Sequence, residues 1–492
     1  MKATKLSLAI ASLISAGFAG QALALDLYVD NKTQQIFAEP GPNRSKLGSF
    51  EKVEETAAQK AEIAKINEDM ALKTNEMKAL DEHMQAAEET KLKMGPDGVS
   101  FESKDGNFKM KVIGRVQMDA QTNVSGQKDA PVGGRLSDGA GLRRARLGVE
   151  GSFYKDYGYK FEYDFAGSAA ENNDGVTDAY LNYTGLKDFN FQVGQFKEPY
   201  GMEIQTSNRF IPFIERSMMS NAFSDSQKTY QDGFGVAYAT PRWTAKAAIQ
   251  TASVLKGWDQ PAAPSRNGDS SYQLAGRLTA LPWFQDKTHL VHLGTSAMYR
   301  QTNETNGTLA FKAALGGNLD RSAVLTTSTF TGKTLPHGIT RFGGEFASVY
   351  GPFAAMAEYT QVDLNGGTKD STSFSGYYGY ATYMLTGESR NYKTATGSWD
   401  RIKPARNFDL KGGLGAWELA VGYDSVDLKD VSMGLKSNSA SLAKAGINWY
   451  PNPRFKIMAN YVHALHVDTA NAKTNMNNLN PDIVEMRAQV DF

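Results

Sequence analysis

From residue 101 to the C-terminus, apolar and polar residues alternate, and this period of two constrains the fold more than any other feature of the chain. Tyr159, Phe161 and Tyr163 alternate with Lys160 and Glu162, and similar runs recur along the sequence. Successive side chains of a β-strand point to opposite faces, so each run has one apolar and one charged face. Aromatic residues at the ends of the apolar faces, over many long segments, favour a membrane barrel over a soluble sandwich.

Sixteen such segments begin near residues 108, 142, 158, 175, 189, 232, 242, 270, 288, 340, 352, 374, 414, 438, 454 and 482. Short connections such as 155–158 alternate with long ones such as 198–231 and 301–339, which is typical of outer-membrane barrels. Closing the sheet into a barrel also gives every backbone N–H and C=O group of the strands a hydrogen-bond partner within the bilayer. We therefore predict an all-β fold, a sixteen-stranded antiparallel transmembrane β-barrel over 101–492, wide enough for an aqueous lumen. The connection 386–413 falls on the side of the short turns, but it is too long for one.

Composition excludes several other classes of protein. The chain has 53 basic and 53 acidic residues, and this balance argues against a nucleic-acid coat. Its mean hydropathy of −0.44 argues against a bundle of apolar membrane helices. There is no cysteine, which excludes disulfides, a thiol nucleophile and cysteine-ligated metals.

The first 24 residues have the pattern of a secretory signal peptide. Lys2 and Lys5 precede an apolar stretch over 6–18, and Ala22-Leu23-Ala24 forms a small-x-small cleavage site. A transmembrane anchor is the alternative, but the apolar stretch is too short for one. We therefore expect the mature protein to cross a membrane and then either to dissolve or to insert as a barrel. Together with the predicted barrel, this indicates the bacterial outer membrane.

Two further segments precede the barrel. Residues 25–49 predict a short hairpin, and residues 50–93 have strongly helical composition. A heptad pattern over 63–87 predicts a periplasmic coiled coil, with Ile at both a and d of the first heptad favouring a trimer. The alternative is a single amphipathic helix docked on its own domain. The a positions are Ile63, Met70, Met77 and Met84, and the d positions are Ile66, Lys73, Leu80 and Ala87.

Several blocks resemble the phosphate-selective porin O and P family, in one order over roughly 101–492: residues 142–147, 178–180, 193–196, 201–203, 376–378, 385–388, 402–404, 415–419 and 448–450. The resemblance implies a trimeric sixteen-stranded outer-membrane porin whose third long loop folds into the lumen. It also implies that 386–413 is a periplasmic turn. Phosphate-selective members carry several lysines before the block at 376–378, whereas residues 360–375 here hold Asp363, Lys369 and Asp370. We therefore expect phosphate to bind little better than other small anions.

The alternation also selects candidate pore residues. Arg144 and Arg146 lie on the same face of a strand, and the apolar residue Leu147 lies on the opposite face. Because the apolar face contacts lipid, both arginines are expected to face the lumen. Arg115 faces inward by the same parity, whereas Arg143 is expected to point the other way, near the rim. Fixed cations in a lumen select for anions. The alternative is that these arginines pair with Glu150, Glu162 or Asp119 and only support the wall.

The long connection 198–231 supplies the other candidates. If it lies in the lumen, Arg209 and Arg216 are expected at the constriction, unless salt bridges with the acids of the loop neutralise them. Lys160 and Lys228 complete the predicted anion path.

Catalytic patterns are absent from the sequence. His289 and His292 are three residues apart on a strand, as are His463 and His466, so each pair points to opposite faces. No Gly-x-Ser-x-Gly, phosphate-loop or Gly-x-Gly-x-x-Gly pattern occurs. We therefore predict a protein that is not an enzyme and needs no cofactor or metal.

The function predicted from these features is a porin for passive diffusion of small anions, with phosphate as one candidate solute. Its expected partners are the outer-membrane bilayer, small anionic solutes and two further copies of the chain, with no nucleic acid. The N-terminal helix could also contact the cell wall. The alternative is a non-conducting envelope protein with a barrel anchor and a helical tether.

Overall fold

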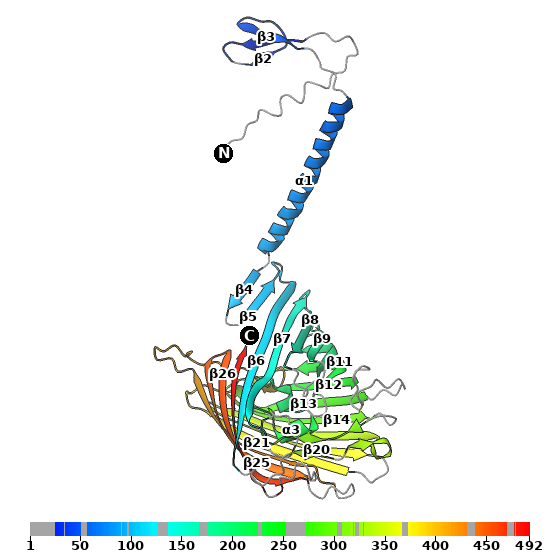
Figure 1. Ribbon diagram of the computed structural model, residues 1–492, viewed down its shortest axis with the longest axis vertical. Helices are drawn as coiled ribbons and strands as arrows, with labels where there is room; N and C mark the ends of the chain where they lie inside the picture. Colours follow the sequence, from blue (N-terminus) through cyan, green and yellow to red (C-terminus); the bar gives the residue numbers. More distant parts are fainter. Residues whose placement is uncertain are drawn as a thin grey trace. The chain divides into compact units, whose positions relative to one another are not determined.

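The computed structural model describes residues 25–33, 35–50, 57–89, 91–95, 98–125, 136–166, 175–224, 229–251, 272–302, 308–317, 319, 324–327, 329–366, 372–430, 438–469, 477 and 479–492. The chain divides into two compact units, Met1–Glu88 and Glu89–Phe492 (Figure 1). The predicted signal peptide and Lys228 lie outside the described residues.

The first unit contains a small sheet and a long helix. Strand β1 (Leu25–Asp30) lies between β2 (Ile36–Phe37) and β3 (Arg44–Phe50), so the structure adds a third strand to the predicted hairpin. Helix α1 spans Ala57–Glu89. All its side chains over residues 61–82 are exposed, including the six predicted core positions in this range, so the coiled coil stays a prediction. No described helix is long and apolar enough to cross a bilayer.

The second unit begins with a hairpin of β4 (Lys91–Gly95) and β5 (Gly98–Glu102). The predicted helical segment included residues 91–93, but they lie in β4. Lys91 pairs with Glu102 and Lys93 pairs with Ser100. Pairing with β5 thus overrides the helical composition of this stretch.

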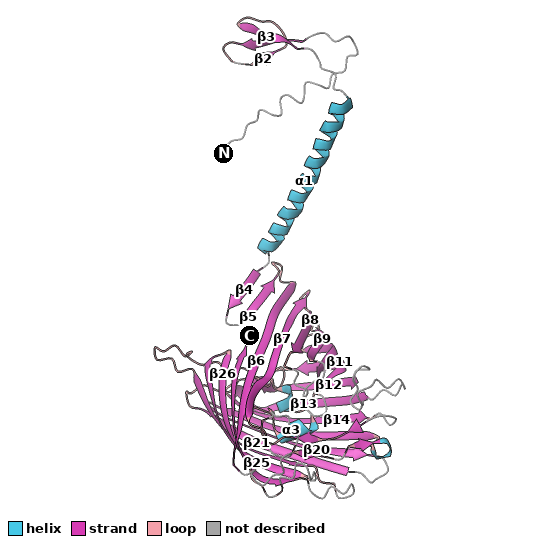
Figure 2. Ribbon diagram, in the orientation of Figure 1, coloured by secondary structure: helices cyan, strands magenta, loops and turns pink. Residues whose placement is uncertain are grey.

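The rest of the second unit is mostly β-structure (Figure 2). Among the described residues, sixteen antiparallel strands form a closed barrel, in which β27 pairs with β6. Each begins within three residues of its predicted start, so the predicted barrel is confirmed. The strands are β6 (Phe108–Ser125), β7 (Gly139–Phe153), β8 (Tyr157–Asp164), β9 (Val176–Tyr183), β10 (Phe189–Lys197), β11 (Tyr230–Ala239), β12 (Trp243–Thr251), β13 (Tyr272–Asp286), β14 (His289–Gln301), β19 (Gly338–Tyr350), β20 (Phe353–Asn365), β21 (Thr372–Met384), β24 (Ala416–Asp427), β25 (Ser439–Asn452), β26 (Phe455–Asp468) and β27 (Asp482–Asp491).

The last residue completes the closure. The backbone of Phe492 exchanges two hydrogen bonds with Gly114 on β6, of 3.0 and 3.1 Å. A Cβ atom on Gly114 would lie 2.2 Å from the Phe492 ring, so only glycine fits beneath this side chain.

The described residues of the connection 302–337 partly fill the inside of the barrel, and we call them the apolar loop. It contains β15 (Thr308–Leu309), β16 (Lys312–Ala313), β17 (Leu325–Thr326), β18 (Phe330–Thr331) and a short 3-10 helix, Gly332–Thr334. Its Phe311 ring lies 5.4 Å from the ring of Phe374 on β21 and 6.0 Å from that of Phe223. One part of the lumen is therefore a packed hydrophobic core.

Candidate pore constriction

The described residues of a second long connection, 198–224 and 229, also lie inside the barrel, and we call them the inward loop. It forms two short helices, α2 (Met202–Gln205) and α3 (Met218–Phe223), and α3 is seen among the barrel strands in Figure 1. Met202, Ile204 and Phe223 are almost fully buried. The inward fold implied by the family resemblance is therefore present in the structure.

Carboxylates of the wall hold the inward loop by its backbone. Glu358 on β20 accepts hydrogen bonds from the amides of Met202 and Glu203, at the start of α2. Asp424 on β24 accepts one from the amide of Met218, at 2.7 Å. These acids therefore bind the otherwise unpaired amides at the first turn of each short helix.

Glu215 connects the inward loop to three arginines of the wall. Its carboxylate lies 2.9 Å from Arg143, 3.3 Å from Arg144 and 2.7 Å from Arg487. Burial raises the pKa of this carboxyl, but the three guanidinium groups outweigh burial and hold the pKa well below its usual range. Glu215 is therefore ionised and acts as the shared counter-ion of this cluster.

The connection between β21 and β24, residues 385–415, is the one that was too long for a short turn, and we call it the inserted turn. Its first part folds inward, whereas Leu410 and Leu414 are exposed. It contains β22 (Tyr392–Lys393) and β23 (Ser398–Trp399). Trp399 is buried, and its indole nitrogen donates to the Tyr380 hydroxyl at 2.7 Å. Arg390 donates to the carbonyl of Phe210 in the inward loop at 2.7 Å. The two connections thus contact each other within the barrel.

A polar cavity of about 290 Å³ lies between the inward loop, β6, β8–β11 and Thr396 of the inserted turn. Four cations and two carboxylates line it, which gives a formal charge of +2 (4 − 2). Tyr180, Tyr230 and Phe196 add aromatic surface. The charged lining residues are Arg115, Lys160, Lys197, Arg209, Glu162 and Asp178.

Three of the predicted arginines, Arg115, Arg144 and Arg146, are buried and face inward, as parity predicts, but each has acidic partners. Arg115 lies 2.9 Å from Glu162, and Arg146 lies 3.0 Å from the same carboxylate. These two contacts match the wall-supporting interpretation that the sequence left open, whereas Arg144 pairs with Glu215 of the inward loop, which was not among the predicted partners.

The remaining candidates lie in different surroundings. Lys160 lines the cavity and lies 2.6 Å from Asp178. Arg209 also lines the cavity and lies 3.3 Å from Asp491. Arg216 is buried beneath the loop, where it donates to the carbonyls of Glu203 and Thr206. Lys160 and Arg209 are thus together at the cavity, and Arg216 is not among its lining residues.

The expectation for Arg143 was wrong. The side chain is buried and faces Glu215, not the rim. The pairing of β6 with β7 shifts here: Gln117 lies opposite Arg144, whereas Met118 lies opposite Leu142. Such a β-bulge places one extra residue on β7 and lets two consecutive side chains point inward.

With this geometry described, the chain can be compared with known proteins. The family model described as phosphate-selective porin O and P matches residues 110–492. The chain belongs to this family. It is 29% identical to Porin O of Pseudomonas aeruginosa over 390 residues, which cover 75% of this chain and 85% of that protein. It is 28% identical to an uncharacterized protein of Caulobacter vibrioides over 371 residues, covering 73% and 69% of the two chains.

Among solved structures, the outer membrane channel DcaP of Acinetobacter baumannii aligns with a TM-score of 0.45 at 16% identity, covering 80% of this chain and 99% of that one. As a member of the porin O and P family with a sixteen-stranded barrel, the protein is a porin of the bacterial outer membrane. No group of His, Cys, Asp and Glu suited to hold a metal occurs in the described part of this porin.

Lys197 of this porin lines the cavity but was not predicted from the sequence. It donates to the carbonyl of Ile204 at 2.9 Å. By alternation Lys197 shares the parity of Val193, which is exposed on the lipid side. Strand β10 ends at Lys197, and the chain turns into the lumen there, so alternation assigns this side chain to the wrong face.

Proposed function

We propose that this porin conducts small anions past Lys160, Lys197, Arg209 and Arg115. The observation that carries the proposal is the polar cavity, where four cations face two carboxylates. Elsewhere in the lumen, wall acids such as Glu358 and Asp424 bind backbone amides of the inward loop. These acids are thus engaged by the backbone of the loop.

The strength of the preference for anions depends on how much water surrounds an anion in the cavity, because water weakens the interaction between charges. Two unit charges about 4 Å apart interact by about 1 kcal/mol in bulk water and by about 4 kcal/mol at an effective dielectric constant near 20. An anion in the cavity therefore gains at most a few kcal/mol. This supports a preference for anions in general, phosphate included, and not tight binding of one of them.

Wild-type protein in a planar bilayer tests the proposal. In a potassium chloride gradient we expect a reversal potential on the anion-selective side, which weakens at high salt as the charges are screened. Phosphate should reduce the chloride current only at millimolar concentrations. A cation-selective potential would contradict the proposal, and a block by micromolar phosphate would indicate a dedicated phosphate site.

We also propose that three copies assemble through a coiled coil of α1. In the described single chain, Met70 and Met77 at heptad position a are 61% and 72% exposed, and a hydrophobic face of this kind favours burial against other copies. Whether α1 also contacts the cell wall stays a prediction, because no residue indicates a wall-binding site.

Substitution of α1 tests this assembly. Met70→Glu with Met77→Glu should reduce the trimer fraction in sedimentation by about tenfold or more and leave single-channel conductance unchanged, because charges in the core destabilise a coiled coil. Leu72→Glu is the matched control, since Leu72 is 58% exposed but lies off the a/d face. Equal effects of the two changes would contradict the coiled coil.

One observation favours the alternative of a non-conducting envelope protein. The apolar loop and the inserted turn bury Phe311, Leu325 and Trp399 inside the barrel. A barrel that these connections seal would anchor the N-terminal unit without passing solutes. Absence of conductance from correctly inserted trimers would support this alternative and contradict the anion channel.

A further inference from the structure

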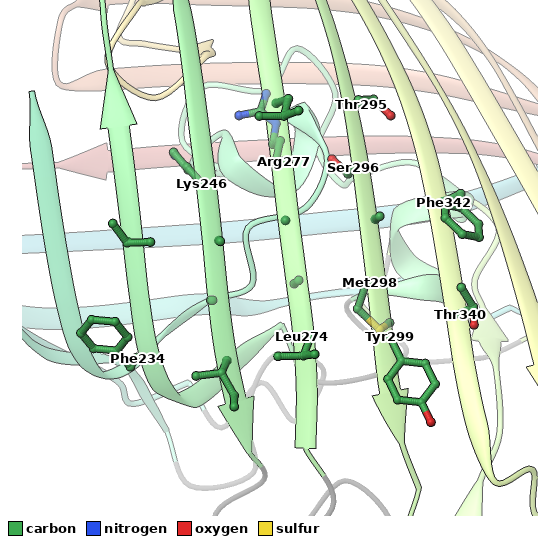
Figure 3. Close-up of a pocket in the computed structure, with 18 residues that line it drawn as sticks. Phe234, Lys246, Leu274, Arg277, Thr295, Ser296, Met298, Tyr299, Thr340 and Phe342 are labelled. Atoms are coloured by element: carbon green, nitrogen blue, oxygen red, sulfur yellow. The ribbon is translucent and has the colours of Figure 1, made fainter.

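The outer face of the barrel wall carries an apolar hollow of about 760 Å³ over β11–β14 and β19. Figure 3 shows Phe234, Leu274, Tyr299 and Phe342 around it. These four side chains are exposed and belong to the lipid-facing set of the wall. The hollow is therefore a feature of the membrane-facing surface and is separate from the pore.

The hollow arises from one row of small residues that runs across neighbouring strands. Ala247 on β12 lies opposite Gly276 on β13, and Gly276 lies opposite Ala297 on β14. The next row, on the side of the long loops, consists of Ile249, Leu274 and Tyr299. A trough is thus left beside a ridge of large side chains.

The trough is open space. A Cβ atom on Gly276 would meet only the carbonyl oxygen of Lys246, at 3.6 Å, which is ordinary contact. The inner side of the wall is packed here, where Tyr200 of the inward loop contacts Ala275 and Met298. The wall therefore does not collapse into the hollow from within.

The lining of the hollow is apolar in character. Lys246 and Arg277 contribute to it, but their charged ends lie on the lumen side. Lys246 donates to Gln205 at 2.9 Å, and Arg277 lies 2.8 Å from Glu345. A ligand of the hollow thus meets hydrocarbon and the Thr295 and Thr340 side chains, and no exposed charge.

We propose that the hollow binds one acyl chain of lipid A, the lipid of the outer leaflet. Tyr299 and Leu274 lie two residues from the long-loop ends of β14 and β13, and long loops of outer-membrane barrels are extracellular. The hollow therefore faces the outer leaflet. The row of small residues beside the row of large ones leaves a depression into which a hydrocarbon chain can pack.

The test compares variants of the full-length protein that differ in the trough. Gly276→Leu places a side chain in it, and Ala297→Leu is a second filling variant if the first does not fold. Gly379→Leu is the matched control, because Gly379 is an outward-facing glycine on β21 with room for a Cβ, away from the hollow. Each protein is titrated with purified lipid A, and separately with phosphatidylethanolamine, in neutral detergent. Bound lipids are counted by native mass spectrometry.

We expect the filling variants to bind lipid A about tenfold more weakly than wild type, because burial of even two methylenes is worth that factor. Gly379→Leu should bind like wild type, and channel conductance should be unchanged in all variants. Unaltered lipid A binding in the filling variants would overturn the proposal. Loss of phosphatidylethanolamine binding alone in the filling variants would also overturn it. A change of oligomeric mass in these variants would overturn it as well, and would assign the hollow to contact with a second copy of the chain. None of these outcomes depends on ion selectivity.

Discussion

Changing Lys197 and Arg209 together to glutamate is expected to convert the channel from anion-preferring to cation-preferring. Both side chains line the polar cavity, and the double change takes its formal charge from +2 to −2. Each reversal raises the energy of a nearby anion by about 2 kcal/mol, twice the attraction of unit charges about 4 Å apart in water. The chloride-to-potassium permeability ratio should therefore fall by at least about tenfold, even with partial screening.

The measurement is the reversal potential of single channels in a potassium chloride gradient. Lys187→Glu with Arg242→Glu is the matched control, because both residues are exposed in short turns and change the net charge of the protein equally. The control should keep the wild-type sign. If both double variants shift the potential equally, the selectivity comes from the overall field of the protein and not from the cavity.

The barrel and the inward direction of its charges could be predicted because both follow from local alternation. Lipid requires apolar side chains outside, and a period of two then fixes the opposite face. Arg115 and Arg146 are buried in the lumen for this reason, whereas Leu147 beside them is exposed.

The partners of these charges could not be predicted from alternation. Glu215 reaches Arg144 from a loop 71 residues further along the chain. Arg143 turns inward because of a register shift with β6, which no single strand encodes. The inserted turn enters the lumen because Trp399, Arg390 and the inward loop contact one another, and this depends on tertiary packing. The site is thus formed at strand ends and loops, where the alternation of apolar and polar residues does not predict which side chains meet.

Removal of the Glu215 charge is expected to have the largest effect on stability. In Glu215→Gln, Arg143, Arg144 and Arg487 lose their shared counter-ion while they remain buried. Loss of one partner from a buried ion pair costs about 3–5 kcal/mol, because the remaining charge is desolvated without compensation. Arg487 keeps Asp119 at 2.7 Å, and Arg144 keeps its hydrogen bond to the side-chain oxygen of Gln117 at 3.0 Å, so we expect a loss near the lower end of this range.

Urea unfolding of the reconstituted barrel measures this loss, and Glu102→Gln is its control. Glu102 also has two cationic partners, Lys109 at 3.1 Å and Lys93 at 3.2 Å, but these lysines are largely exposed. Exposed pairs contribute about 0–1 kcal/mol, so the control should unfold almost like wild type. Because the pKa of Glu215 is depressed, its stabilising charge is present at neutral pH and is lost only as the pH falls through that low pKa. The difference between Glu215→Gln and wild type should therefore persist from pH 7 to pH 5. Equal unfolding midpoints for the two variants would mean that Glu215 does not hold the inward loop to the wall.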